Sequence, residues 1–188
     1  IVESVLSRYV SAIKDERSLA SEVFKWDKKI TITDEKEFID NLEKALYSSK
    51  ICAYAQGFSL MSEASKEYNW NLELGEIALI WKEGCIIRAE FLNSIKEAYA
   101  ENPGLSNLMV SPVFNSIIND CQPALREIIS LAVASGCSIP GLMSALLYFD
   151  GYRTKDSSIN LLQAQRDYFG AHTYERVDKK GSFHTNWQ

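Results

Sequence analysis

Apolar residues recur every three or four positions along almost the whole chain, which is the spacing of amphipathic helices. The first such pattern begins at once, with Val2, Val5, Leu6, Tyr9, Val10 and Ile13. No initiator methionine precedes it, and neither does a Ser, Thr, Asp or Asn that could cap a helix. We therefore expect the chain to be part of a longer protein that extends upstream.

Two long helices are expected at the centre of the fold. Thr33 or Asp34 can cap the first, which should run to about residue 66. Its apolar stripe comprises Phe38, Leu42, Ala45, Leu46, Ser49, Cys52, Ala53, Gln56 and Leu60. Pro112 suits the first turn of the second, which should end near Gly136 and be kinked at Pro123.

Shorter helices are expected at about residues 72–81, 86–99 and 142–148, and a last one from Ser157 or Ser158 to about Gly170. No pair of strands joined by a hairpin turn is convincing. The pattern thus predicts an all-α, multi-helix domain with long central helices and an extended C-terminal tail. We place the domain in residues 1–155, and the last helix with its tail in residues 156–188.

Charge and hydropathy narrow the kinds of partner. The 188 residues carry a net charge of −5, which argues against a broad nucleic-acid surface but leaves room for a small basic pocket that holds one phosphate. No apolar run approaches the roughly 20 residues needed to cross a bilayer, and the first residues are unlike a signal peptide. We expect a cytoplasmic protein that binds neither nucleic acid nor membrane.

The four cysteines, Cys52, Cys85, Cys121 and Cys137, lie far apart in apolar surroundings. They form no C-x-x-C pair and have no neighbouring histidine, so we expect buried, reduced thiols rather than a metal site.

The chain offers little chemistry of its own. Its nine glycines never form G-x-G-x-x-G, and residues 136–141 lack the Lys and Ser/Thr of a phosphate loop. With two histidines and no nucleophile elbow, a Ser/His/Asp triad is also improbable. We expect neither a nucleotide-binding domain nor a catalytic residue in this chain.

The most distinctive segment is the tail, which reads QAQRDYFGAHTYE at residues 163–175 and FHTNW at residues 183–187. It closely resembles the C-terminal segment of the decarboxylating 6-phosphogluconate dehydrogenases. Four further blocks resemble that family in the same order, and they lie at residues 3–17, 54–61 (YAQGFSLM), 74–88 and 148–153. Several blocks in the right order make the resemblance highly specific.

The resemblance implies an enzyme of which this chain is one part. Members of the family oxidise 6-phosphogluconate at C3 and decarboxylate the 3-keto intermediate, which gives ribulose 5-phosphate, carbon dioxide and NADPH. Their N-terminal half binds NADP, and their helical C-terminal half forms a homodimer whose tail enters the partner subunit. The family's catalytic lysine and glutamate and its nucleotide-binding glycines would lie upstream of this chain.

By the same resemblance, three residues bind the substrate phosphate. Arg8 would contribute from the main subunit, and Arg166 and His172 from the partner's tail. Their chemistry suits an anion, because a guanidinium presents a planar fork of donors to phosphate oxygens. Six residues along one helix would set Arg166 and His172 about 120° apart. We expect Gly170, as a left-handed cap, to let them converge.

Each of these assignments has a plainer alternative. Arg8 could pair with Asp15 or Glu16, and Arg166 with its neighbour Asp167. Other tail residues are expected to be structural, with Tyr168 and Phe169 in the helix core, His184 anchoring the tail and Arg153 in an ion pair.

Two other functions stay open at this stage. One is a free-standing helical interaction module that is derived from the enzyme domain. The other is a related dehydrogenase that acts on a different 3-hydroxy acid.

Overall fold

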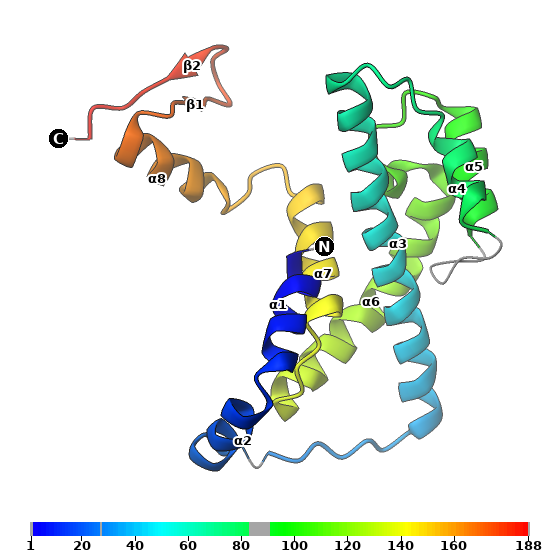
Figure 1. The fold of residues 1–188 in the computed structure, drawn as a ribbon, viewed down its shortest axis with the longest axis vertical. Helices are drawn as coiled ribbons and strands as arrows, with labels where there is room; N and C mark the ends of the chain where they lie inside the picture. The colour runs from blue at the N-terminus through cyan, green and yellow to red at the C-terminus, as the bar shows by residue number, and fades with distance from the viewer. Residues whose placement is uncertain (1, 27, 83–90, 188) are drawn as a thin grey trace. The chain divides into compact units, whose positions relative to one another are not determined.

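The computed structural model describes residues 2–26, 28–82 and 91–187 (Figure 1). They form two compact units, Ile1–Leu146 and Leu147–Gln188. The described elements are α1 (Val2–Ala12), α2 (Lys14–Val23), α3 (Glu35–Glu67), α4 (Leu74–Ile80), α5 (Leu92–Glu101), a 3₁₀ turn η1 (Leu108–Val110), α6 (Pro112–Ser135), α7 (Pro140–Arg153), α8 (Asn160–Gly170), β1 (Tyr174–Glu175) and β2 (Ser182–Phe183). The expectation of an all-α fold with long central helices is confirmed.

Helix α3 begins where the sequence predicts, because Asp34 caps it. The Asp34 carboxylate accepts a hydrogen bond from the backbone N–H of Glu37 at 2.9 Å, which satisfies one of the free donors of the first turn. The helix then runs without a break to Glu67. Its predicted length is correct to within a residue or so.

Helices α3 and α6 pack side by side and carry most of the core of the N-terminal unit (Figure 1). The face that α3 buries differs in part from the predicted stripe. Leu46 and Leu60 are 54% and 63% exposed, respectively. The buried positions of α3 are Ala45, Ser48, Ile51, Cys52, Ala55 and Phe58. Small side chains along this face let α6 approach closely.

An aromatic cluster extends this core toward α4 and α5. Phe58 lies fully buried between Trp81 and Tyr99, with ring centroids 5.6 and 5.8 Å away. Phe91 makes edge contacts to Tyr54 at 5.1 Å and to the rings of Tyr47 and Phe114. These edge-to-face contacts fix how α4 and α5 lie against the long helices.

Helix α6 continues through Pro123 as one element and ends at Gly136. Gly136 has a φ of 74° in the left-handed region, which a glycine adopts without strain. A Cβ at this position would lie 2.8 Å from the ring of Trp26. The Trp26 indole N–H also donates to the Ala134 carbonyl at 3.2 Å, so the chain before α3 is held against the end of α6.

The first predicted helix is interrupted. Ile13 has φ −87° and ψ 57°, and it separates α1 from a second helix, α2, that periodicity did not indicate. Neither α1 nor α2 buries a residue completely. Val2, Val5 and Tyr9 are each more than two thirds exposed, so the apolar face of α1 has no cover within the described chain.

The cysteine prediction is correct in part. Cys52 and Cys121 are buried and reduced, but Cys137 is exposed just beyond the Gly136 turn. Burial raises the pKa of Cys52 to about 11. Cys85 and the start of the predicted 86–99 helix lie outside the described residues, and α5 runs from Leu92 to Glu101.

The C-terminal unit contains the end of α7, α8 and a short antiparallel pair of strands, β1 and β2. Tyr174 lies opposite Phe183 and Glu175 opposite Ser182. The expectation of no strand pair is therefore wrong. Each strand has two residues, too few to show an alternating pattern in the sequence.

Candidate functional site

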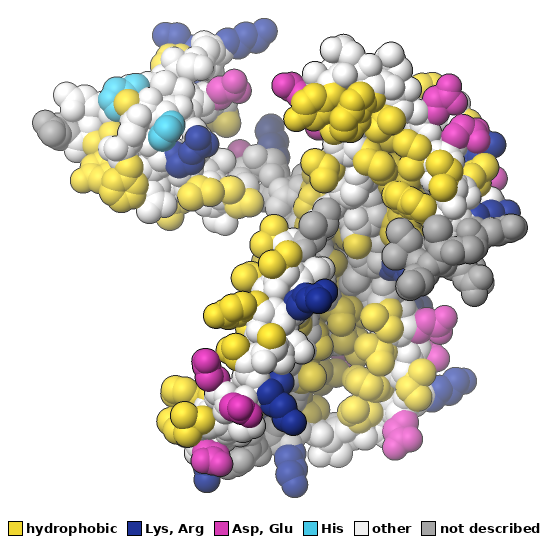
Figure 2. Space-filling model, viewed as in Figure 1, with side chains coloured by type: hydrophobic (Ala, Val, Ile, Leu, Met, Phe, Trp, Pro, Cys, Tyr) yellow, Lys and Arg dark blue, Asp and Glu magenta, His cyan; other side chains and the backbone are white. Residues whose placement is uncertain are grey.

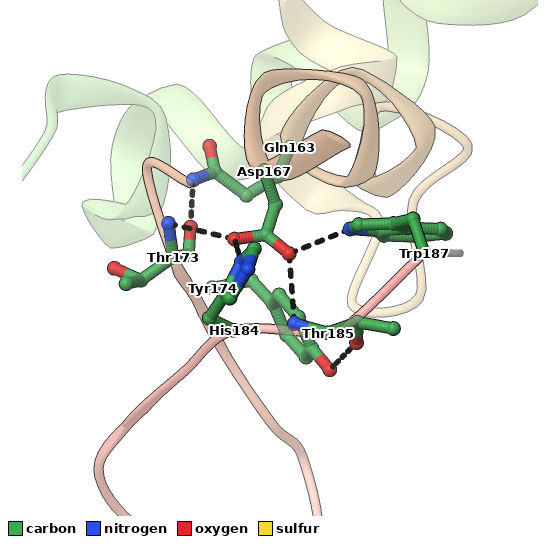
Figure 3. Close-up of polar contacts among 7 residues, drawn as sticks. All are labelled: Gln163, Asp167, Thr173, Tyr174, His184, Thr185 and Trp187. Atoms are coloured by element: carbon green, nitrogen blue, oxygen red, sulfur yellow. Dashed lines mark hydrogen bonds and ion pairs between the residues drawn. The ribbon is translucent and has the colours of Figure 1, made fainter. Parts of the chain in front are cut away.

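The C-terminal unit is organised around the carboxylate of Asp167, which projects from α8 (Figure 3). Oδ1 accepts hydrogen bonds from the backbone N–H of Thr173 at 3.0 Å and from Nδ1 of His184 at 2.9 Å. Oδ2 accepts from the backbone N–H of Thr185 at 3.0 Å and from the indole Nε1 of Trp187 at 2.9 Å. Four donors from three places in the tail thus meet on one side chain.

Asp167 is fully buried, and among the described residues it is the one charged side chain in that class. Burial alone raises the pKa of a carboxyl group, because it disfavours the charged form. Here the N–H groups of Thr185, His184, Trp187 and Thr173 outweigh burial and hold the pKa of Asp167 well below its usual range. The group is therefore a carboxylate, and His184 carries a hydrogen on Nδ1.

Three further contacts surround this centre. The Gln163 amide Nε2 donates to the Thr173 carbonyl at 2.5 Å, and the Tyr174 and Thr185 hydroxyls are 2.6 Å apart. The Trp187 ring meets Tyr168 edge-on, with centroids 6.0 Å apart. The tail after α8 is therefore a folded structure that is bonded to the helix, rather than a loose end.

The chain leaves α8 through two left-handed residues. Ala171 has a φ of 50° and Thr173 a φ of 64°, and the Ala171 N–H donates to the Asp167 carbonyl at 2.9 Å. The left-handed cap is thus Ala171, and the prediction that Gly170 takes this role is wrong. Gly170 matters for another reason, since a Cβ there would lie 2.9 Å from Nε2 of His172.

Arg166 and His172 both belong to this unit and are exposed. The Arg166 guanidinium donates from NH1 to the side-chain oxygen of Gln163 at 3.1 Å. No ion pair joins Arg166 to Asp167 in the part of the chain that the structure describes. The histidine side chains lie at the surface of the C-terminal unit, in the view of Figure 2. Both predicted tail residues are therefore accessible to a ligand.

Arg8 is an exposed residue of α1 and belongs to the N-terminal unit. Among the described residues it forms no ion pair with Asp15 or Glu16, the plainer alternative for this side chain. Its guanidinium is therefore accessible, as a phosphate contact requires.

The structural roles expected of other tail residues can now be compared with the fold. His184 anchors the tail through Asp167, and Arg153 forms an ion pair with Asp150 at 2.8 Å, so these two predictions are confirmed. Tyr168 and Phe169 are 60% and 75% exposed, so the prediction that they are core residues is wrong within this chain.

Sequence reasoning missed the importance of Asp167. The available signal was its position one turn after Gln163, on the same face of α8, before a segment rich in donors. A buried helical carboxylate requires such donors, and the FHTNW block supplies three of them.

Two kinds of cofactor site, a metal cluster and a strand–turn–helix dinucleotide site, are not found among the described residues. No group of three or more His, Cys, Asp or Glu side chains among them could hold a metal ion. No described helix is long and apolar enough to cross a membrane. The described strands are the antiparallel pair β1 and β2, so these residues contain no strand–turn–helix unit of the kind that holds a dinucleotide.

These features define a helical domain and a C-terminal unit whose tail is hydrogen-bonded to α8 and displays cationic and imidazole groups. The profile described as "6-phosphogluconate dehydrogenase, C-terminal domain" matches residues 1–187. The chain is 53% identical over its full length to the decarboxylating 6-phosphogluconate dehydrogenase of Staphylococcus aureus strain N315, and 52% identical to that of Staphylococcus epidermidis. It therefore belongs to the family of 6-phosphogluconate dehydrogenase C-terminal domains.

A solved structure agrees with this assignment. The 6-phosphogluconate dehydrogenase of Plasmodium falciparum, described in its apo form and in complexes with NADP⁺ and 6-phosphogluconate, superimposes with a TM-score of 0.86 at 42% identity. The alignment covers 96% of this chain and 39% of that protein. The chain likewise spans 40% of the length of the Staphylococcus relatives.

Proposed function

We propose that the complete protein oxidatively decarboxylates 6-phosphogluconate to ribulose 5-phosphate and carbon dioxide, with reduction of NADP, in the cytoplasm. This chain supplies substrate-phosphate binding and dimerisation. The NADP-binding domain and the groups that perform the chemistry lie in a part of the protein upstream of this chain. Membership of the family and the NADP⁺ and substrate complexes of the Plasmodium falciparum relative support the proposal.

The observation that carries this chain's part is the display of Arg166 and His172 from a folded tail. Both side chains are exposed, while the segment after them is hydrogen-bonded to the Asp167 carboxylate. Arg166 has donors to spare beyond its bond to Gln163, because a guanidinium carries five N–H groups. Arg8 would complete the set from the other subunit, with a second guanidinium for the phosphate.

Exchange of tails between two subunits is supported by the apolar surface of the C-terminal unit. Leu161, Leu162 and Phe169 of α8 are 77%, 56% and 75% exposed, respectively. Burial of such apolar side chains lowers the free energy. A second subunit would cover them. Sedimentation of this chain at micromolar concentration tests its part in dimerisation, and a monomer under those conditions would contradict it.

The enzymatic proposal is tested with the full-length protein. NADPH formation from 6-phosphogluconate is expected, and its absence would contradict the proposal. Charge-assisted hydrogen bonds are worth about 1.5–3 kcal/mol each, so Arg166→Ala should raise KM roughly 10- to 150-fold. The same assay with gluconate, which lacks the phosphate, separates this activity from that of a relative that acts on another 3-hydroxy acid.

A further inference from the structure

We propose that Asp167 is a positioning residue of the phosphate site: its carboxylate fixes the tail against α8 and thereby sets the directions of Arg166 and His172. The inference rests on the proposed function, since it assigns these two residues to the substrate phosphate. Asp167 itself touches no ligand, because it is fully buried. Its effect passes through the backbone and through neighbouring side chains.

The donors that meet on Asp167 come from far apart in the chain. Thr173 lies six residues beyond Asp167, His184 seventeen, Thr185 eighteen and Trp187 twenty. No described residue of the tail after Asp167 is fully buried, and its two strands have two residues each, so polar and ring contacts must order it. Four of these hydrogen bonds end on Asp167, more than on any other side chain of the tail that the structure describes. The Asp167 carboxylate is therefore the main group that holds the tail in a single conformation.

Both proposed phosphate ligands, Arg166 and His172, lie next to residues that take part in these hydrogen bonds. His172 directly precedes Thr173, whose N–H is held by Asp167 and whose carbonyl is held by Gln163. Gln163 in turn accepts a hydrogen bond from Arg166. One amide side chain thus links the Arg166 guanidinium to the carbonyl of Thr173, the residue after His172. If Thr173 lost its hydrogen bond to Asp167, neither the Arg166 guanidinium nor the backbone beside His172 would keep its fixed position.

The chemistry of the four bonds requires a carboxylate. Each Asp167 oxygen accepts two N–H groups, and an ionised carboxylate has acceptor sites for all four. An asparagine of the same shape has one acceptor oxygen, and its amide nitrogen cannot accept the N–H groups that it would face. The His184 ring can accept from an amide in its other tautomer, but the Thr173, Thr185 and Trp187 N–H groups can only donate. Asp167→Asn should therefore leave at least one of these N–H groups without an acceptor, with no change in side-chain volume.

The experiment uses full-length enzyme and compares Asp167→Asn with Asp178→Asn. Asp178 lies in the same tail, but it is exposed and pairs with Arg176 at 2.6 Å, so it serves as a matched control. We expect Asp167→Asn to raise KM for 6-phosphogluconate about 10-fold or more, while kcat and KM for NADP stay within about two-fold, because lost positioning weakens phosphate binding. Asp178→Asn should leave all three constants unchanged.

A second comparison separates positioning from a general loss of structure. Once Arg166 and His172 are both replaced by alanine, Asp167 has nothing left to position. The further change Asp167→Asn should then alter KM by less than about two-fold, as expected for residues that act through one another. A large additional loss, or a fall in kcat with unchanged KM, would overturn the inference.

The outcomes also distinguish this inference from the proposed function. If Arg166→Ala and His172→Ala leave KM unchanged, the assignment of the phosphate site fails. If they raise KM while Asp167→Asn does not, the positioning inference alone fails. Should Asp167→Asn not fold, Trp187→Phe keeps the aromatic contact to Tyr168 and removes one donor. It should raise KM by a smaller factor, and an unchanged KM would count against the inference.

Discussion

Gly170 and His172 lie so close that a single methyl group would not fit between them. A Cβ built on Gly170 would be 2.9 Å from Nε2 and 3.0 Å from Cδ2 of the His172 ring. Gly170 is the last residue of α8, and its φ is not in the left-handed region. The absence of a side chain at residue 170 thus leaves room for an exposed imidazole, rather than for a turn.

Gly170→Ala should therefore weaken substrate binding without destabilising the fold. Alanine suits a helical backbone and is favoured over glycine by up to about 1 kcal/mol. The His172 ring would have to rotate away, so KM for 6-phosphogluconate should rise several-fold, while the melting temperature should not fall. Gly151→Ala is the control, because its Cβ would meet only Ile159 at an ordinary 3.5 Å. Equal KM values for the two variants would contradict this account of Gly170.

Gly136→Ala should destabilise the N-terminal unit. An alanine at a φ of 74° costs about 1–2 kcal/mol, and its Cβ would also meet the Trp26 ring at 2.8 Å. Urea unfolding should show a lower midpoint than for the wild type. Gly141→Ala, where a Cβ meets nothing within 4 Å, should not lower it. The opposite ranking of the two variants would rule out the proposed strain.

The order of the tail should depend on pH through Asp167. Its folded pKa is depressed, so its stabilising contribution is complete above the unfolded aspartate pKa of about 3.9 and is lost as the pH falls below that value. Hydrogen exchange of the Thr185 amide in wild type and in Asp167→Asn can measure this contribution. The excess protection of the amide in wild type over the variant should be constant near pH 6 and shrink below pH ~3.9. A difference that grows on acidification would contradict the assignment.

The described cysteines should react with thiol reagents in a set order. Cys137 is exposed, whereas Cys52 is buried with a pKa of about 11, so little of its thiolate forms near neutral pH. Alkylation followed by mass spectrometry should label Cys137 first, and Cys52 and Cys121 only on unfolding. Cys137→Ser should remove the fast reaction, and early labelling of Cys52 would contradict the burial described above.

The helical framework could be predicted because its signals are local. Asp34 and Pro112 mark helix starts through short-range hydrogen bonding and fixed φ, and Gly136 marks an end through its left-handed φ. Cys137 shows the limit of such signals. It follows an apolar helix in the sequence, but it lies beyond the turn and is exposed. Burial depends on which segment returns to cover a position, and periodicity alone does not contain that information.

The candidate site could be predicted only in part. Arg166 and His172 were found by their resemblance to a known motif, and both lie at the surface as a site requires. The suggested pairing of Arg166 with Asp167 failed because neighbouring residues point about 100° apart on a helix and do not face each other. The true partners of Asp167 are up to twenty residues away, in a tail without periodic pattern.

The central claim is that the tail of this chain binds the phosphate of the substrate. Calorimetric titration tests it most directly. Full-length wild type and the double variant Arg166→Ala/His172→Ala are each titrated with 6-phosphogluconate and with gluconate. The wild type should prefer the phosphorylated ligand strongly, and the double variant should lose most of that preference while its weak affinity for gluconate changes little. An undiminished preference in the double variant would contradict the claim.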